Sequence, residues 1–397
     1  MSVPMPYTSD AAPAGLAEVR LLLASGFQPD YVREVANAHA RLGYRVQIMG
    51  GDMHEGQPYH PNVTLLNLRG NDARDRNPIR EVAKLAAYYA RVFRCVASHG
   101  GGTVYDVSIG RPVLRCALMY PLFRLVGKRI VYTAHNVLPH DADTMANRMV
   151  YWFAYRVLAN AIVVHGQAIK ERIIAEFGVD ADRVHVVAHG TYHPHDRETI
   201  GKTEARERLG IEPDERVLLC FGLQRYYKGT HFAMEALDGY GAKGLRLIVR
   251  GHAPEAAYRE LIERISRTHR GPVAFDVKCG AVADDEMELL FKACDVVLLP
   301  YLEGSQSGIK FMAYAYGRPV LASAVGSLRE YIVPGQTGET FACGDPAAFR
   351  AALERMLANL ASYTPDAIAA YAREHCSFDA AARQVDALCA RLARRAA

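Results

Sequence analysis

The sequence lacks both long apolar runs and paired cysteines. No window approaches the eighteen uncharged apolar residues of a membrane span, and the first residues lack the basic start and apolar stretch of a signal peptide. The eight cysteines include no C-x-x-C pair, and several, such as Cys220, lie inside apolar runs. We therefore expect buried, reduced cysteines in a cytoplasmic protein, with no zinc site and no disulfide framework.

The sequence also lacks a strong excess of one charge. It carries 47 Lys and Arg against 43 Asp and Glu, a net charge of +4, so no nucleic-acid partner is expected. Half of its 397 residues are hydrophobic. This is enough apolar material for the cores of two or three domains.

One segment contains no acidic residue. Residues 107–140 hold five bases among many apolar residues, namely Arg111, Arg115, Arg124, Lys128 and Arg129. The segment could rest on anionic headgroups and admit a lipid-linked acceptor. It could equally form an ordinary half-buried helix and strand, because Arg115 and Arg124 fall on opposite sides of a helical wheel. The sequence leaves both interpretations open.

Short apolar runs alternate with helical patterns along most of the chain, which predicts an α/β protein with two doubly wound parallel sheets. A polar, proline-containing stretch over residues 192–214 interrupts the alternation. We expect domains at 1–192 and 193–375, with a C-terminal helix, 376–397, packing on the first domain. The expected strands are 19–24, 44–49, 63–68, 103–107, 129–133, 161–165 and 183–188, then 217–221, 245–250, 273–277, 296–299 and 320–322.

Two loops in the second half have anion-binding features. Each follows an expected strand and precedes a helix, and in parallel sheets ligands bind at the carboxyl ends of strands, next to helix N-termini. The loop 222–229 carries Arg225 and Lys228, and the loop 300–308 is rich in Gly and Ser. Arg and Lys both bind phosphate, so the two loops predict one anion site.

The stretch from Pro300 resembles the carboxyl-domain signature of the GT-B glycosyltransferases of family four, P-S-x-x-E-G-F-G-L-P-x-x-E-A-M-A-x-G-x-P-V-I-A followed by G-G-x-x-E. The loop holds one extra residue, and Met312 stands where the family has its second Glu, which usually holds the donor ribose. The resemblance covers most of the chain. Matching positions are Glu303, Gly304, Ser307, Gly308, Ile309, Ala313, Ala315, Gly317, Pro319, Val320, Gly326 and Glu330.

The resemblance implies two Rossmann-like domains facing each other across a cleft, and roles for particular residues. A donor diphosphate would be held by Arg225, Lys228 and the Ser307-Gly308-Ile309 turn, and Glu303 would bond to sugar hydroxyls. The phrase T-A-H-N-V-L-P-H, which follows an expected strand, resembles a subgroup acting in bacterial polysaccharide assembly, where the His corresponding to His135 reaches the donor sugar. The remaining candidates for the acceptor side or the cleft are Asn136, His140 and Gly26.

We therefore expect a hexosyltransferase that uses a UDP- or GDP-sugar and a glycan or polyprenyl-diphosphate-linked acceptor, with peripheral membrane association. Neither anion loop carries paired carboxylates, so no metal and no other cofactor is expected. The family implies retention of anomeric configuration, although the subgroup also resembles inverting mannosyltransferases. Two alternatives are a sugar-nucleotide epimerase, which would need more acids than Glu303, and a non-catalytic binding subunit, which would explain Met312.

Overall fold

The structure, a computed structural model, describes residues 19–24, 28–71, 76–99, 102–108, 115–138, 144–192, 200–304 and 306–394. By their contacts the residues fall into two compact units. The first unit comprises Met1–Val163, Ile174–His185 and Ala382–Ala397, and the second comprises Val164–Ile173 and Val186–Ala381. In the described ranges no helix is long and apolar enough to cross a membrane.

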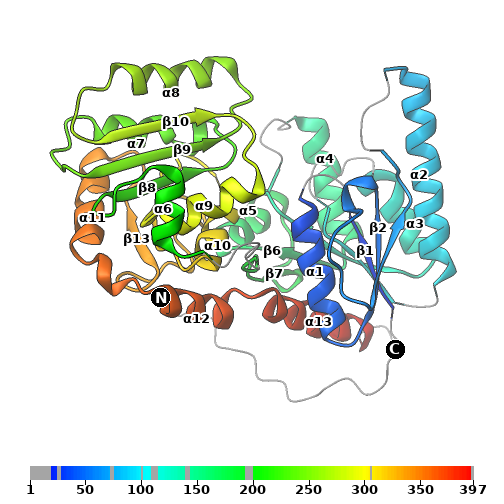
Figure 1. The fold of residues 1–397 in the computed structure, drawn as a ribbon. Coiled ribbons are helices and arrows are strands. Elements are labelled where there is room, and N and C mark those ends of the chain that lie inside the picture. The colour runs from blue at the N-terminus through cyan, green and yellow to red at the C-terminus, as the bar shows by residue number, and fades with distance from the viewer. Residues whose placement is uncertain are drawn as a thin grey trace. The chain divides into compact units, whose positions relative to one another are not determined.

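The first sheet has the strand order β3-β2-β1-β4-β5-β6-β7 among the described residues. Strands β1 to β5 pair in parallel, and in Figure 1 α1 lies on one side of β1 and β2 while α2 and α3 lie on the other. The strands are Val19–Leu23 (β1), Arg45–Gly50 (β2), Val63–Asn67 (β3), Thr103–Asp106 (β4), Arg129–Ala134 (β5), Ala161–Val164 (β6) and Val184–Val186 (β7). The helices are Pro29–Arg41 (α1), Asp52–His54 (η1), Pro78–Ser98 (α2), Arg115–Met119 (η2), Tyr120–Leu125 (α3), Met145–Phe153 (α4), Ala154–Leu158 (η3), Gln167–Phe177 (α5) and Ala181–Arg183 (η4).

The second sheet has the order β10-β9-β8-β11-β12-β13, with every neighbouring pair parallel. Its strands are Arg216–Phe221 (β8), Leu245–Gly251 (β9), Ala274–Cys279 (β10), Val296–Leu299 (β11), Val320–Ser323 (β12) and Gly338–Phe341 (β13). The helices of this part of the chain are Lys202–Leu209 (α6), Tyr226–Lys228 (η5), Thr230–Leu237 (α7), Ala256–Thr268 (α8), Asp284–Ala293 (α9), Gly308–Ala315 (α10), Pro346–Ala358 (α11), Leu360–Ser362 (η6), Pro365–His375 (α12) and Phe378–Arg394 (α13).

The central strands of the second sheet are buried on both faces. All four residues of β11 and of β12 are buried, because helices cover both sides of a parallel sheet. This burial explains why these strands read as continuous apolar runs in the sequence. The two anion loops therefore begin at the carboxyl ends of buried strands, β8 and β11, which hold the start of each loop in place.

The polar stretch 192–214, for which no strand or helix was predicted, contains a helix, α6. Arg206 of α6 is buried and donates from Nη2 to Asp295 Oδ2 at 2.8 Å and from Nε to the Ala293 carbonyl at 3.1 Å. Asp295 also accepts from the Val217 amide, at 2.6 Å, and pairs with Lys202. The buried ion pair fixes α6 to the start of β8 and β11, so this part of the polar stretch is an integral element of the second unit.

The C-terminal helix α13 has residues in both units. Phe378, at its start, packs on Tyr192 with ring centroids 5.6 Å apart, and both residues belong to the second unit. Asp386, further along, belongs to the first unit and accepts from the buried Arg20 Nη2 at 2.8 Å and from the Tyr44 hydroxyl.

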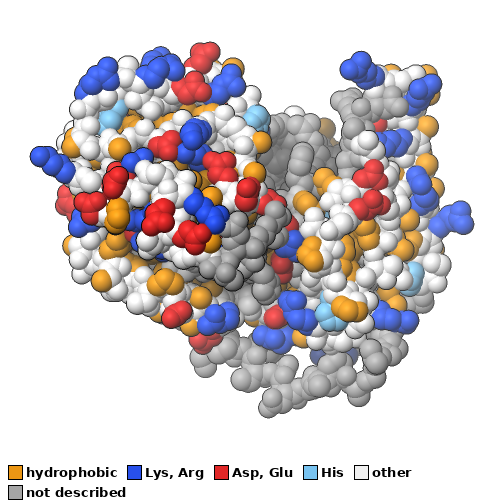
Figure 2. Space-filling view, viewed as in Figure 1, with side chains coloured by type: hydrophobic (Ala, Val, Ile, Leu, Met, Phe, Trp, Pro, Cys, Tyr) orange, Lys and Arg blue, Asp and Glu red, His pale blue; other side chains and the backbone are white. Residues whose placement is uncertain are grey.

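The charges on the second unit are mixed. Figure 2 shows Lys and Arg side chains interspersed with Asp and Glu over the part of the molecule that carries α8. Mixed charge of this kind is typical of an ordinary solvated surface.

Candidate active site at the carboxyl ends of the second sheet

The loop after β8 folds so that the Lys228 ammonium lies near Gly222, the first residue of the loop. Gly222 has a φ of +96°, and a Cβ placed on it would lie 3.8 Å from Lys228 Nζ and 3.3 Å from Ile309 Cδ1. The ammonium group and the first turn of α10 therefore meet at one glycine. Since Gly222 offers only backbone there, a ligand can approach closely.

The loop after β11 is bonded directly to the loop after β8. The Leu302 amide donates to the Tyr227 carbonyl at 2.8 Å, and Lys228 Nζ lies 5.5 Å from the centroid of the Tyr301 ring. Gly229 has a φ of +68°, and a Cβ on it would lie 1.9 Å from the Pro300 carbonyl oxygen, so only glycine fits. The two loops predicted to bind one anion do form one structure.

Ser307 is the N-cap of α10. Its Oγ accepts from the Ile309 amide at 3.3 Å and lies 2.8 Å from the Tyr301 hydroxyl. The first four amides of a helix have no partner inside the helix, and Ser307 satisfies one of them. The other amides of the first turn and the positive end of the helix dipole favour an anion at this helix end.

His189 and Tyr192, which the sequence analysis did not propose as binding residues, stand at the same helix end. A Cβ on Gly308 would lie 3.8 Å from His189 Cε1 and 4.0 Å from the Tyr192 hydroxyl. The His189 ring stacks on Phe311, 5.3 Å between centroids, and lies 5.1 Å from His165. The only sequence signal was the position of His189 just after a strand.

Gln224 fixes the shape of the loop after β8. Its buried side chain donates from Nε2 to the Gly222 carbonyl at 2.9 Å and to the Arg250 carbonyl at 3.2 Å, and its Oε1 accepts from Thr230 Oγ1 at 2.7 Å. All three bonds are local to the β8–α7 connection and β9. Gln224 thus holds the backbone of Gly222 in place.

Arg225 and Glu303 lie at the edge of this arrangement. Arg225 Nη1 is 3.5 Å from Glu255 Oε1, and both side chains are partly exposed. Glu303 is exposed, and its amide donates to the Tyr227 carbonyl at 3.3 Å. Met312, at the position of the family's second Glu, is partly buried and packs against the apolar core.

Lys310 and Glu330 are tied to structural partners. Lys310 Nζ donates to the carbonyls of Leu328 at 3.1 Å and Glu330 at 2.6 Å, and burial lowers the pKa of Lys310 to about 8. The Glu330 carboxylate accepts from the Gln167 amide at 2.9 Å and so caps α5. Glu330, which matches the family signature, has a capping role in this chain.

His135 and Asn136 lie in the first unit, directly after β5. His135 Nε2 lies 3.2 Å from the Val107 carbonyl, a contact in which the nitrogen is the donor, and the ring edge meets Tyr31 at 5.2 Å between centroids. Both His135 and Asn136 are partly buried. Gly26 and His140 lie outside the described residues.

Carboxylate pairs occur away from the anion loops. The sequence contains two Asp-x-Asp spacings, at Asp141 to Asp143 and at Asp180 to Asp182. The first lies outside the described residues, and in the second Asp180 accepts from the Asp182 amide at 3.0 Å as a helix cap. Within the described ranges, no three His, Cys, Asp or Glu side chains are grouped so as to hold a metal ion.

Two family models match the chain, one on each side of the 193–214 stretch. The model described as Glycosyltransferase Family 4 matches residues 29–192, and the model described as Glycosyl transferases group 1 matches residues 215–359. The chain is a GT-B glycosyltransferase of family four. The family predicted from the motif after Pro300 is thereby confirmed, and the two sheets described above confirm the predicted doubly wound α/β fold.

Relatives of this glycosyltransferase include D-inositol 3-phosphate glycosyltransferase of Xylanimonas cellulosilytica, 27% identical over 353 residues that cover 83% of this chain and 82% of the relative. D-rhamnosyltransferase WbpZ of Pseudomonas aeruginosa is 32% identical over 151 residues, 37% of this chain and 36% of the relative. Among solved structures, HepE of Anabaena in complex with UDP and glucose has a TM-score of 0.71 at 18% identity, with 93% of this chain and 98% of HepE covered.

Proposed function

We propose that this glycosyltransferase moves a hexosyl group from a nucleotide-diphosphate sugar to a glycan or lipid-linked acceptor, without a metal ion and with retention of configuration. The observation that carries the proposal is the meeting of Lys228, Gly222 and the Ser307-capped start of α10. The likeness to HepE, whose structure contains UDP and glucose, supports a nucleotide-diphosphate donor.

The chemistry follows from where charge develops. When the anomeric C–O bond breaks, negative charge accumulates on the leaving diphosphate, and fixed cations and N–H donors near it lower the barrier. Lys228 supplies a cation, and the Gly308 amide supplies a donor with the favourable helix dipole. The Ile309 amide would join it by exchanging Ser307 Oγ for a phosphate oxygen. His189 and Tyr192, beside Gly308, would add polar contacts to the same phosphate groups.

Arg225 would bind the diphosphate by giving up its contact with Glu255. Its contact with Glu255 is long, at 3.5 Å, and partly exposed, so the pair is weak. A bidentate Arg–phosphate contact is stronger than such a pair. We therefore infer that Arg225 leaves Glu255 when the donor binds.

The remaining residues would position the sugar and the acceptor. Glu303 would bond to sugar hydroxyls, and His135 would contact the donor sugar, with Asn136, His140 and Gly26 on the acceptor side. In this proposal none of these residues acts as an acid or a base towards the phosphates. Their contribution would be orientation, which can supply a large part of the rate enhancement.

The test is a panel of UDP- and GDP-sugars, each assayed for thermal stabilisation and for transfer to glycan and lipid-linked acceptors. A ligand at 100 times its Kd stabilises the folded state by about 2.7 kcal/mol. We expect one nucleotide class to raise the Tm of the wild type and of Lys243→Ala, an exposed lysine outside the site, but much less that of Lys228→Ala. Equal stabilisation of all three proteins would contradict this donor site, and epimerised donor without transfer would favour the epimerase.

A further inference from the structure

A second cationic site lies in the first unit, at the amino ends of the strands. His135 lies at the opposite, carboxyl end of β5. A cavity of about 340 Å³ opens beside the amino ends of the strands. Arg129 begins β5, Asn160 immediately precedes β6, and Arg183 immediately precedes β7, whereas His135 follows the other end of β5. The cavity is lined by Arg124, Arg129, Val157, Ala159, Asn160, Arg183 and Leu392.

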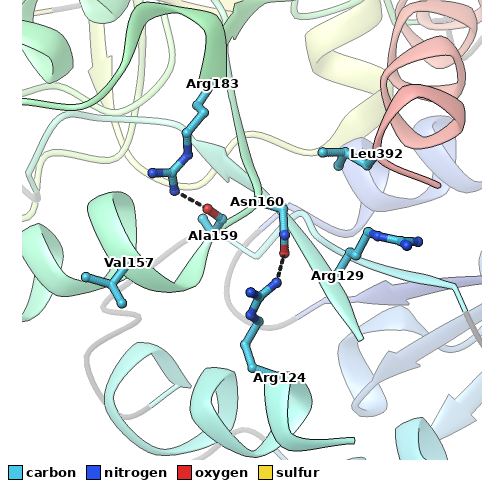
Figure 3. Close-up of a pocket in the computed structure, with 7 residues that line it drawn as sticks. All are labelled: Arg124, Arg129, Val157, Ala159, Asn160, Arg183 and Leu392. Carbon is cyan, nitrogen blue, oxygen red and sulfur yellow. Dashed lines mark hydrogen bonds between the residues drawn. The ribbon is translucent and has the colours of Figure 1, made fainter. Parts of the chain in front are cut away.

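The three arginines of this pocket have no carboxylate among the lining residues. Figure 3 shows Arg124 and Arg183 approaching the Ala159–Asn160 turn from opposite sides. Arg124 Nη1 donates to Asn160 Oδ1 at 2.8 Å. Arg183 donates to backbone carbonyls at the end of η3, including that of Tyr155 at 2.9 Å. Neutral oxygens satisfy these donors but do not balance the charge.

Arg129 is the least satisfied of the three. Its side chain is partly buried and, within the described part of the chain, makes no hydrogen bond or ion pair, whereas its amide donates to the Gly102 carbonyl at 3.3 Å. Burial lowers the pKa of Arg183, and the charges of Asp180 and Arg124 act on it in opposite directions. Three guanidinium groups line the cavity with no carboxylate beside them in the lining, and a phosphate would accept bidentate contacts from them.

An apolar surface adjoins the pocket. Nine of the thirteen large hydrophobic side chains that are exposed in the described ranges lie on η2, α3, α4 and η3, which pack on one another, or directly after α3. Val157 belongs both to this surface and to the pocket lining. The nine are Leu118, Leu122, Leu125, Val126, Met145, Met149, Trp152, Phe153 and Val157.

We propose that the pocket binds the headgroup phosphate of an anionic phospholipid while the apolar side chains of α3 and α4 enter the membrane interface. The combination favours a lipid over a free phosphate, because a free phosphate would leave the apolar surface unexplained. Lys128, another base of the acid-free segment, takes no part, because it is buried against the His99 carbonyl. The proposal does not depend on the donor or on the transfer reaction.

The experiment uses the full chain with vesicles of phosphatidylcholine mixed equally with phosphatidylglycerol. Trp152 is the only tryptophan and lies on the apolar surface, so its emission should shift to shorter wavelength on binding. Arg124→Gln/Arg129→Gln should bind these vesicles about tenfold or more weakly, since each surface cation contributes about 1 kcal/mol. Arg264→Gln/Arg267→Gln, on α8 of the second unit, removes equal charge and should bind within about twofold of wild type.

The apolar half of the surface has its own matched pair. Leu125→Ser/Met149→Ser should weaken vesicle binding and reduce the Trp152 shift, whereas Ile79→Ser/Val82→Ser, which alters two exposed hydrophobic residues of α2, should do neither. Unchanged vesicle binding in the Arg124/Arg129 variant, with its Tm unchanged, would overturn the proposal. Equal affinity for vesicles of phosphatidylcholine alone would also overturn it. So would a protein that binds soluble glycerol phosphate but does not bind the vesicles.

Discussion

Lys228 is the residue whose position most directly predicts an effect on activity. Its ammonium lies beside Gly222, which Ile309 of α10 also approaches, and the leaving diphosphate is proposed to lie there. Lys228→Ala should lower kcat/KM by about 2 kcal/mol, near thirtyfold, because it removes a charge-assisted contact. Arg225→Ala should cost a similar amount and Lys243→Ala almost nothing. Steady-state kinetics with unchanged Tm values would check this, and turnover within about twofold of wild type would remove either residue from the site.

His135 offers a test of a different kind. If it contacts the donor sugar, His135→Ala should depress turnover by about one to three orders of magnitude while leaving nucleotide affinity nearly unchanged. The effects should separate because the proposed nucleotide contacts belong to the second unit. A purely structural His135, held by Val107 and Tyr31, would instead lower the Tm and leave turnover per folded molecule normal. Calorimetry beside single-turnover kinetics distinguishes the two.

The sequence predicts site residues that carry a recognisable charge or motif, but it does not reveal residues that are defined by neighbours distant in sequence. Lys228, Ser307 and Ile309 stood in loops that parallel-sheet geometry places together. His189 and Tyr192 could not be assigned, because their nearness to Gly308 depends on how far residues 186–192 run along the second unit. Gln224 was missed because its partners are mostly backbone carbonyls, which leave no pattern in the sequence.

At the scale of an element, α6 contains a matched pair of arginines. Arg206 bonds to the buried Asp295, whereas Arg208 pairs with Glu204 at an exposed i, i+4 position. Arg206→Ala should lower the free energy of unfolding by about 3 kcal/mol, because it leaves a buried carboxylate short of a partner. Arg208→Ala should cost about 0.5 kcal/mol or less. Urea denaturation measures both, and equal losses would contradict the anchoring role of α6.

Helix α10 carries a pH dependence through Lys310. The pKa of Lys310 is about 8 in the folded chain against 10.5 for an ordinary lysine, so the unfolded chain binds more protons between these values. Stability attributable to Lys310 should therefore rise with pH across that window, by about 3 kcal/mol in total.

The measurement is the difference in unfolding free energy between wild type and Lys310→Met from pH 7 to 10.5, which cancels the titration of other groups. The exposed Lys243→Met serves as the control and should show a flat difference. A flat difference for Lys310 as well would show that its ammonium is no more costly to bury than to expose.

Elements buried on both faces were predicted to within a residue or two. Strand β11 was predicted as 296–299 and observed as Val296–Leu299, because a continuous apolar run has few alternatives. Helix α6 was missed because most of its residues are charged and it is held by an ion pair rather than an apolar stripe. The apolar pattern also predicts a helix around residues 148–158, whereas α4 begins at Met145 and passes into the wider turns of η3 at Ala154.

For the molecule as a whole, we expect activity without a divalent ion. The proposed diphosphate contacts are side-chain cations and backbone amides, which can stabilise the leaving group alone. Transfer rates and nucleotide-induced stabilisation should be the same with and without EDTA. Activity that disappears with EDTA and returns with Mg²⁺ or Mn²⁺ would contradict the proposed mechanism, and it would direct attention to carboxylates outside the two loops, such as Asp141 and Asp143.

The path of α13 limits how this protein can be divided. A fragment ending at residue 192 would lack Asp386 and leave the buried Arg20 guanidinium without its carboxylate. A fragment beginning at residue 193 would lack the segment 164–173, whose first helical turn is capped by Glu330. Two halves made separately should therefore be poorly folded alone and recover their structure when produced together, so the two sheets are not independent modules that evolution or an engineer could exchange by a single cut.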